Sequence, residues 1–277
     1  MKLNHPLLKS KKFLVGIGTF LFFIILAAVG SWLMPNPKAM IDLPWKPPSF
    51  ERILGTDLFG RDVFSLFAHG LDMSIRIGVI SGIGATLLGV IIGAVAGYKG
   101  GWVDDLLMSI TNIMLVIPSM ALLIVIAAFL KIRDEMFLAF MIAIFSWPWT
   151  ARSIRSQTLS LKAREFIDLP RISGLSEFEI IIQDILPNML SYVFMCFVLQ
   201  MASGILSETG LSMIGLGPTD IVSLGMILRW ALLWESVRLG KWWVFIPPTI
   251  AITLLSTSLL LLNTAMDEVF NPRMRKM

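Results

Sequence analysis

The composition of this 277-residue chain excludes an ordinary soluble domain. Hydrophobic residues make up 56% of the chain and charged residues 15%, whereas soluble domains carry roughly 25% charged residues. The formal net charge of +4 does not indicate a nucleic-acid partner, because basic residues of a membrane protein gather at the ends of its cytoplasmic loops. We therefore expect the chain to be embedded in a lipid bilayer and to bind no nucleic acid.

Six apolar stretches can span a bilayer, and each except the fourth approaches or exceeds the ~20 helical residues that a crossing needs. They cover residues 13–34, 77–98, 106–130, 136–150, 189–211 and 244–266. The first stretch is longer than the apolar core of a cleaved signal peptide, so we expect it to remain as an anchor. Helical length without sustained two-residue alternation predicts an all-α membrane protein with six transmembrane helices.

The distribution of lysine and arginine predicts how the chain is oriented. Basic residues are more frequent in segments that face the cytoplasm when the N-terminus lies inside, which places both termini in the cytoplasm. Residues 35–76 and 215–243 are then external, and residues 151–188 form a cytoplasmic loop. We expect a multi-pass protein of the cell (inner or plasma) membrane. Its first part, 1–76, holds the tail, first helix and external loop, and its second, 77–277, is a five-helix core.

The residue patterns that catalysis and metal binding need are missing. No Gly-x4-Gly-Lys-Ser/Thr loop is present to cradle a phosphate. His5, His69 and the single Cys196 do not have the spacing of zinc ligands. No Ser/His/Asp order can be assembled within one compartment. We predict that the chain is not an enzyme, has no metal site and holds no cofactor, so that any ATP and magnesium would bind to another subunit.

Polar residues in the predicted spans are candidates for lining a passage. Asn112, Gln200 and Glu208 stand out, because polar and ionisable groups at membrane depth are costly. For Glu208 the alternative is an interfacial position, where it caps the following short helix or pairs with a nearby base. For Asn112 and Gln200, as for Asn263, the alternative is a hydrogen bond between helices.

The strongest functional signal lies in the polar segment between the fourth and fifth spans. Residues 163–188, here named the knuckle, read as a short helix, a turn at Gly174, a second helix and Pro187 before the next span. Such a projection can dock into a groove on another protein through an apolar helix face. The candidate residues for that face are Phe166, Ile167, Leu169 and Ile172.

A second motif lies in the first external segment. It consists of Gly55, Thr56, Asp57, Gly60, Arg61 and Asp62. Asp57, Arg61 and Asp62 are close enough in sequence to form a charge cluster. No catalytic role fits this set, so we predict that the cluster orders the outer loop against the membrane entrance.

The knuckle resembles the cytoplasmic loop of bacterial importer permeases that are driven by ATP-binding-cassette (ABC) subunits. That loop reads Glu-Ala-Ala-x3-Gly-x9-Ile-x-Leu-Pro in the family. The corresponding positions here are Asp168, Leu169, Pro170, Gly174, Leu186 and Pro187. The spacing matches throughout, but the first three residues differ from the pattern, and Asp184 stands where the family has isoleucine.

Two further stretches resemble the second membrane subunit of the dipeptide/oligopeptide/nickel permease family. Residues 55–63 resemble its Gly-Thr-Asp-x2-Gly-Arg-Asp signature, and residues 266–275 resemble its Asp-x3-Asp-Pro-Arg-x-Arg ending, with Asn271 at the second Asp position. Residues 96–104 and 211–218 also fit family positions. The resemblance therefore runs from the first helix to the end of the chain.

The resemblance implies a type I ABC importer permease fold and a heterodimeric passage made with a homologous permease subunit. Two cytoplasmic ATPase subunits would dock on the knuckles, and an extracytoplasmic solute-binding protein would deliver the cargo. Trp230 and Trp234 would contact that protein or cover the gate, unless they join Trp242 and Trp243 in an interfacial aromatic belt. The residues expected to transmit ATPase closure to the spans are Phe166, Ile167, Asp168, Leu169, Pro170 and Gly174.

Short peptides are the cargo that the resemblance favours. The close alternative is the same machine importing cello- or manno-oligosaccharides, since relatives of this family carry sugars; nickel and glutathione are weaker options. A membrane receptor or scaffold without a transport role would need no ATPase partner. An intramembrane enzyme would need paired polar catalytic groups in its spans, and the sequence does not supply them.

Overall fold

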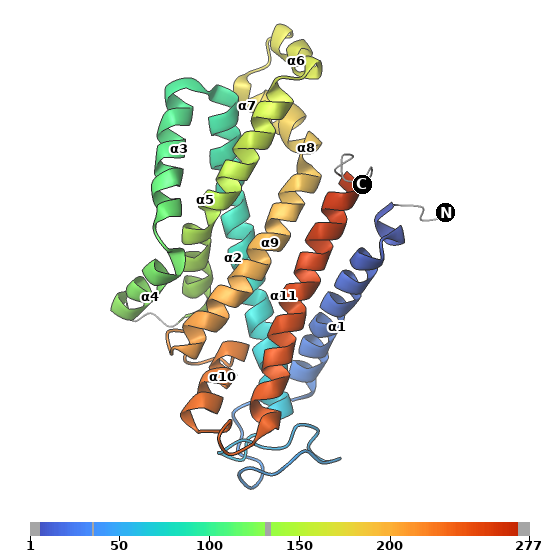
Figure 1. The fold of residues 1–277 in the computed structure, drawn as a ribbon, viewed down its shortest axis with the longest axis vertical. Coiled ribbons are helices and arrows are strands. Elements are labelled where there is room, and N and C mark those ends of the chain that lie inside the picture. Colours follow the sequence, from blue (N-terminus) through green and yellow to red (C-terminus); the bar gives the residue numbers. More distant parts are fainter. Residues whose placement is uncertain (1–5, 35, 131–133, 271–277) are drawn as a thin grey trace.

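The computed structural model describes residues 6–34, 36–130 and 134–270, which form an elongated bundle of helices (Figure 1). Five helices are long and apolar enough to cross a membrane. They are α1 (Lys11–Leu33), α2 (Val63–Lys99), α5 (Glu135–Lys162), α9 (Leu190–Met213) and α11 (Trp242–Phe270). A sixth span is present if the bent pair of α3 (Gly101–Val116) and α4 (Ser119–Leu130) is counted as one. The predicted all-α membrane fold is therefore confirmed.

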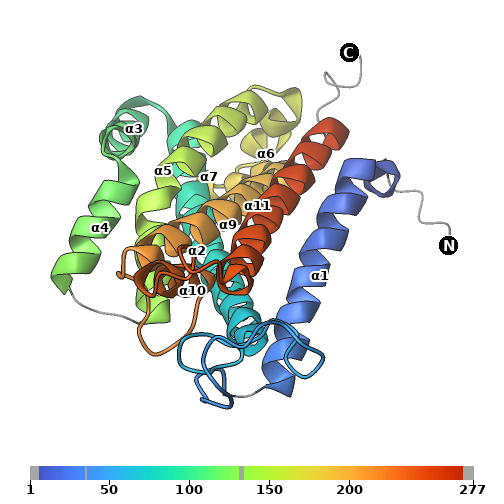
Figure 2. The same ribbon diagram turned by 60° about the horizontal axis from the view of Figure 1, so that its bottom comes forward.

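The remaining helices are short and lie at the two ends of the bundle. α10 (Leu224–Leu233) precedes α11 at one end, together with the long connection between α1 and α2. The described ends of the chain and the knuckle lie at the other end (Figure 1). We call these the loop end and the knuckle end. In both views α3 and α4 lie on the opposite flank of the bundle from α1 (Figures 1 and 2).

Three predicted boundaries differ from the structure. α2 begins at Val63 rather than near residue 77, because the carboxylate of Asp62 accepts a hydrogen bond from the Ser65 amide at 2.9 Å and caps the helix. Residues 63–76 are thus helical, and the expected division at 76/77 falls inside α2. The fourth span continues to residue 162. The third span breaks between α3 and α4, which meet at 79° beside Pro118.

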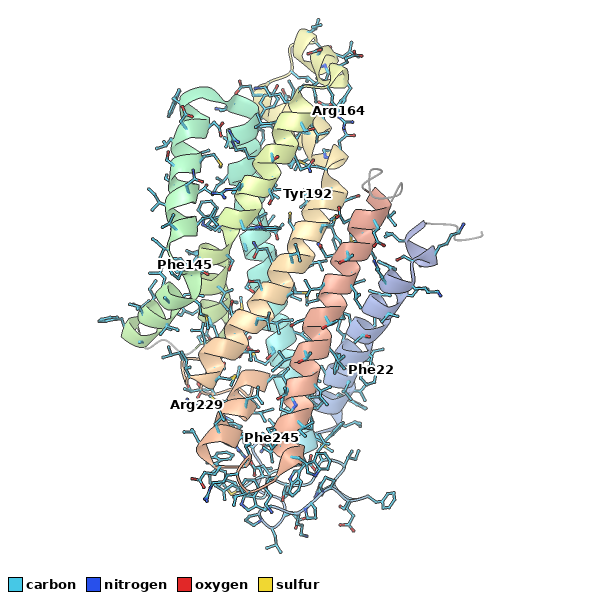
Figure 3. All side chains as sticks on the ribbon, viewed as in Figure 1. Phe22, Phe145, Arg164, Tyr192, Arg229 and Phe245 are labelled. Carbon is cyan, nitrogen blue, oxygen red and sulfur yellow. The ribbon has the colours of Figure 1, made fainter. Side chains whose placement is uncertain are left out.

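α2 lies at the centre of the bundle and packs on α1, α5 and α9. Its Gly89, Gly93 and Gly97 follow one another at four-residue spacing on the face that meets α5. A Cβ at Gly93 would lie only 2.4 Å from the carbonyl oxygen of Ala151. Small residues at such a contact let two membrane helices approach closely and gain dispersion energy. The rest of the surface is apolar on many faces, as exposed Phe22 on α1 illustrates (Figure 3).

Candidate functional site

The knuckle projects from the bundle between α5 and α9 (Figure 1). It contains a 3-10 turn, η2 (Glu165–Ile167), and α6 (Asp168–Ile172), followed by a reversal at Gly174. The second short helix is α7 (Glu177–Ile180). It is followed by the π-helical turn η3 (Ile181–Ile185) and by α8 (Leu186–Asn188), which leads to α9. The predicted order of helix, glycine turn and helix is therefore present. Gly174 has a φ of +80°, a conformation that glycine adopts without a steric penalty.

The base of the knuckle is anchored in the bundle by apolar side chains. Ile167, Ile180 and Ile185 are fully buried and belong to one apolar cluster with Tyr98 and Leu161. The expected exposed face included Ile167, and that part of the expectation is wrong. The 3-10 turn directs this side chain inward, where its burial ties the knuckle to the ends of α2 and α5.

The tip of the knuckle is apolar and exposed. Leu169, Ile172 and Phe178 are 71%, 83% and 69% exposed, while Phe166 is at the margin of exposure and Pro170 is half-buried. Phe178 was missed from the sequence, although its position in the second short helix is a signal for it. Leu169 and Ile172 share one face of α6 at three-residue spacing, and a pair of exposed apolar side chains on one helix face fits an interaction surface.

Polar contacts fix the root of the knuckle. The Lys162 ammonium donates a hydrogen bond to the Tyr98 carbonyl at the end of α2. Ser176 and Glu179 form a capping box, in which the Glu179 amide donates to Ser176 Oγ and the Ser176 amide donates to Glu179 Oε2 at 2.8 Å. Hydrogen bonds from the Ser176 hydroxyl and amide hold the pKa of Glu179 below its ordinary value. Hydrogen bonds therefore stabilise the base of the knuckle, while the apolar side chains of α6 are exposed.

The outer-loop motif forms a buried ion pair at the loop end. Arg61 Nε donates to Asp57 Oδ2 at 2.6 Å, and Asp57 Oδ1 accepts from the amides of Phe59 and Arg61. Thr56, Asp57, Arg61 and Asp62 are all buried. Asp62 caps α2 and meets Arg52 at 3.4 Å rather than Arg61. The predicted charge cluster is present, with the charges divided between two pairs.

Arg61 also joins the loop to α10. Its guanidinium carbon lies 4.3 Å from the Trp230 ring centroid and 5.2 Å from those of Trp234 and Phe59. Trp230 and Trp234 are stacked with centroids 5.5 Å apart. Such cation–π contacts contribute about 0.5–2 kcal/mol, most when desolvated. These two tryptophans therefore hold the outer loop in place.

The backbone of the motif is fixed by its glycines and by α11. Gly55 and Gly60 have φ values of +62° and +70°, and a Cβ at Gly60 would lie 1.9 Å from the Asp42 carbonyl oxygen. Trp243 is buried and its indole Nε1 donates to the Thr56 carbonyl at 3.0 Å. Trp243 thus differs from an interfacial belt residue, while Trp242 is exposed.

Glu208 is fully buried on α9 beside polar hydroxyls. Ser74 Oγ on α2 donates to Glu208 Oε2 at 2.8 Å, and Ser212 Oγ donates to Oε1 at 2.6 Å. The same Ser74 oxygen accepts from the Leu224 amide at the start of α10. Glu208 therefore acts within a network that joins three helices and supports the N-terminus of α10. This is close to the capping alternative, and none of the described cavities has Glu208 in its lining.

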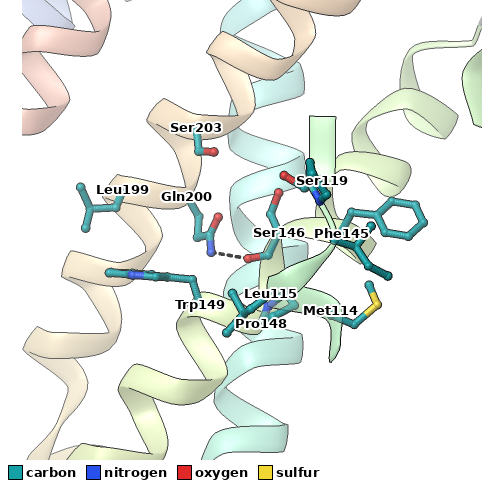
Figure 4. Close-up of a pocket in the computed structure, with 12 residues that line it drawn as sticks. Met114, Leu115, Ser119, Phe145, Ser146, Pro148, Trp149, Leu199, Gln200 and Ser203 are labelled. Atoms are coloured by element: carbon teal, nitrogen blue, oxygen red, sulfur yellow. Dashed lines mark hydrogen bonds between the residues drawn. The ribbon is translucent and has the colours of Figure 1, made fainter. Parts of the chain in front are cut away.

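Gln200 lies at a cavity of about 460 Å³ beside the break between α3 and α4 (Figure 4). Its amide nitrogen donates to the Ser146 carbonyl at 2.8 Å and to Thr150 Oγ1 at 2.7 Å, so it links α9 to α5. Ser119 and Ser203 line the same cavity. Gln200 thus combines both roles considered for it, since it makes an interhelical hydrogen bond and lines a cavity.

Asn112 lines a second cavity of about 300 Å³, nearer the knuckle end, between α3 and α5. Its side-chain oxygen accepts from Arg152 at 2.7 Å. One turn away, Arg155 donates through Nε to Asp104 at 2.5 Å in a two-pronged ion pair. These two pairings were not predicted from the sequence, because Arg152 lies 40 residues from Asn112 and Arg155 lies 51 residues from Asp104.

The helical bundle, the braced knuckle and the polar cavities define a multi-pass α-helical membrane protein of the permease class. Residues 89–276 match the family model described as "Binding-protein-dependent transport system inner membrane component", so the chain belongs to that family. The match includes residues 271–276, which hold most of the C-terminal motif and lie outside the described residues.

Named relatives narrow the resemblance. The chain is 32% identical to the oligopeptide transport system permease protein OppC of Mycobacterium tuberculosis, over 92% of this chain and 89% of that protein. It is 29% identical to the dipeptide transport system permease protein DppC of Bacillus subtilis, over 97% of this chain and 84% of that protein. These findings confirm the predicted resemblance to the second membrane subunit of dipeptide/oligopeptide permeases, and with it the type I importer permease fold.

Proposed function

We propose that this chain is one of two permease subunits of an ABC importer for short peptides. It would form half of a passage with a homologous permease, in a cell membrane, with the knuckle end in the cytoplasm. The names of the relatives support a peptide cargo, because both cited proteins are permeases of peptide transport systems. ATP and magnesium would bind to two ATPase subunits and not to this chain.

The observation that carries the proposal is the contrast within the knuckle. Leu169 and Ile172 are exposed on α6 at its tip, while Ile167 and Ile180 are buried at its base. A motion imposed on the tip would therefore reach α2 and α5 through packed side chains instead of being absorbed by a flexible loop. An ATPase groove that receives the tip could in this way tilt the spans as it closes on ATP.

The loop end would face a solute-binding protein outside the cell. The buried Asp57–Arg61 pair and the two stacked tryptophans make this surface rigid. A rigid surface favours docking because little conformational freedom is lost on association. Residues of the outer loop would then present the contact, while the buried motif would keep that loop in shape.

Reconstitution of the whole transporter tests this proposal. Vesicles containing both permeases and the ATPases would be supplied with the binding protein and, side by side, labelled tripeptides and cello-oligosaccharides. We expect ATP-dependent peptide accumulation and no sugar accumulation. Accumulation of the sugar alone would show that the cargo is an oligosaccharide and not a peptide. Failure of ATPase subunits to co-purify with this chain would favour a receptor or scaffold.

A further inference from the structure

The two cavities beside α3 and α5 lie one after the other along the same faces of these helices. On α5, Phe145, Trp149 and Arg152 line them at spacings of four and three residues. On α3, Leu115, Asn112 and Met108 do so at spacings of three and four. Residues at these spacings share one helix face. The face therefore runs from the α3–α4 break toward the knuckle end, and we call it the α3–α5 groove.

The groove carries polar groups at membrane depth. Asn112 lies about 16 Å along α3 from its first residue, at ~1.5 Å per residue. The Arg152 and Asn112 side chains are exposed in this single chain. A guanidinium facing hydrocarbon is costly, so charged residues in spans face a bundle interior or a water-filled cavity. The groove is thus the wall of an aqueous passage rather than a lipid-facing surface.

The two arginines of the groove have different partners. Arg155 is matched by the carboxylate of Asp104. Among the described residues Arg152 has a neutral hydrogen-bond partner, the Asn112 amide. Because a guanidinium carries five donors in a planar fork, Arg152 retains donors for a second group. The group that such a fork binds best is a carboxylate.

We propose that Arg152, oriented by Asn112, receives the terminal carboxylate of a peptide as it moves through the passage. This inference rests on the proposed function and names the part of the cargo that the passage recognises. A neutral oligosaccharide offers no anion to this site. Asp104 and Asp105 also line the cavity and bring the formal charge of its lining to zero. The attraction is therefore weak enough for a transported molecule to leave again.

The test compares trialanine with its C-terminal amide in vesicles that contain the complete transporter. The wild type should carry the free acid faster than the amide. Arg152→Gln should slow the acid about tenfold, as expected for loss of a charge-assisted hydrogen bond, and leave the amide unchanged. Arg152→Lys keeps the charge and should keep part of the preference. Lys11→Gln removes an exposed positive charge from the start of α1, on the opposite flank of the bundle from the groove; it is the control and should behave as wild type.

The binding protein is the same in every variant, so its own preference cancels when the acid-to-amide ratios are compared. An unchanged ratio in Arg152→Gln, or an equal loss for both peptides, would overturn the assignment while leaving peptide transport intact. Failure of the wild type to carry either peptide would instead overturn the proposed function itself.

Thiol labelling of the same complex tests the groove if Arg152→Gln does not assemble. Cys196 is the only native cysteine and is buried, so it contributes little background from this chain. Met108→Cys lies in the groove, and Ile91→Cys lies at similar depth on an exposed apolar stretch of α2. A charged thiol reagent added from the knuckle end should label Met108→Cys, more slowly with trialanine than with its amide, and spare Ile91→Cys. Equal resistance of both cysteines to the reagent would contradict a water-filled groove.

Discussion

The close contact between α2 and α5 predicts the effect of replacing Gly93 by alanine. The new Cβ would lie 2.4 Å from the Ala151 carbonyl oxygen, 2.9 Å from the Ile154 Cβ and 3.0 Å from the Arg155 amide nitrogen. The first and last of these are backbone atoms of α5, so no side-chain rotation relieves the clash. Since ordinary contact begins at 3.4 Å, the two helices must separate locally by about 1 Å.

The expected cost follows from two opposing effects. Overpacking of a closely packed contact costs about 1–3 kcal/mol, while alanine in place of glycine in a helix gains roughly 0.5–1 kcal/mol. The net loss of unfolding free energy is therefore about 0–2.5 kcal/mol, with a central value of about 1 kcal/mol. Gly18→Ala on α1 is the matched control, because no described atom lies within 4 Å of its Cβ position. That variant should be neutral or slightly more stable.

Unfolding of the purified permease in detergent, followed by tryptophan fluorescence, measures both variants. Gly93→Ala should unfold at lower denaturant than the wild type and Gly18→Ala should not. If Gly93→Ala proves as stable as Gly18→Ala, α2 and α5 are not held in the close contact described at Gly93.

Three further changes have defined outcomes. Arg61→Lys keeps a charge near Asp57 but loses the planar contact with the tryptophans. The free energy of opening of the outer loop should fall by about 1 kcal/mol, so that protease cleaves the loop faster. Unchanged cleavage would show that the cation–π contact does not stabilise the loop. Glu208→Ala leaves the hydroxyl of Ser74 without its acceptor and should lower the unfolding free energy by about 1–3 kcal/mol, whereas Glu208→Gln should lose less; equal losses would argue against the network. Gly174→Val forces a β-branched residue to a φ of +80°, which costs about 1–3 kcal/mol locally, and should reduce transport per ATP hydrolysed; unaltered coupling would show that the turn is not needed.

The fold was predictable where the chemistry is local. Long apolar runs require helices in a bilayer because every backbone group must be hydrogen-bonded internally. The start of α2 was misplaced because His69, Asp72 and Arg76 make residues 63–76 look like a polar loop. Their polarity is compensated by burial of apolar residues such as Val63 and Leu66 in the same turns. The capping carboxylate of Asp62 was the local signal for the true boundary.

The candidate sites divide in the same way. The spacing of the knuckle gave its turn at Gly174, since the backbone conformation there depends on the residue itself. The inward direction of Ile167 depends on packing against Tyr98 and was not visible in the sequence. The link between Arg152 and Asn112 spans 40 residues and depends on how α3 and α5 lie side by side. Periodicity within one helix carries no information on such pairings.

Coupling to the ATPase subunits depends most directly on the exposed tip of the knuckle. Replacing Leu169 and Ile172 together by glutamate adds charge where the side chains are 71% and 83% exposed, so the fold should persist. Leu8→Glu, at an exposed site of the N-terminal turn η1 (Pro6–Lys9), lies outside both the knuckle and the loop end and is the control. The measurement is co-purification of the ATPase subunits together with ATP-driven peptide uptake. We predict that the double variant loses both while the control keeps both; a double variant that retains its ATPases and wild-type uptake would contradict coupling through the knuckle.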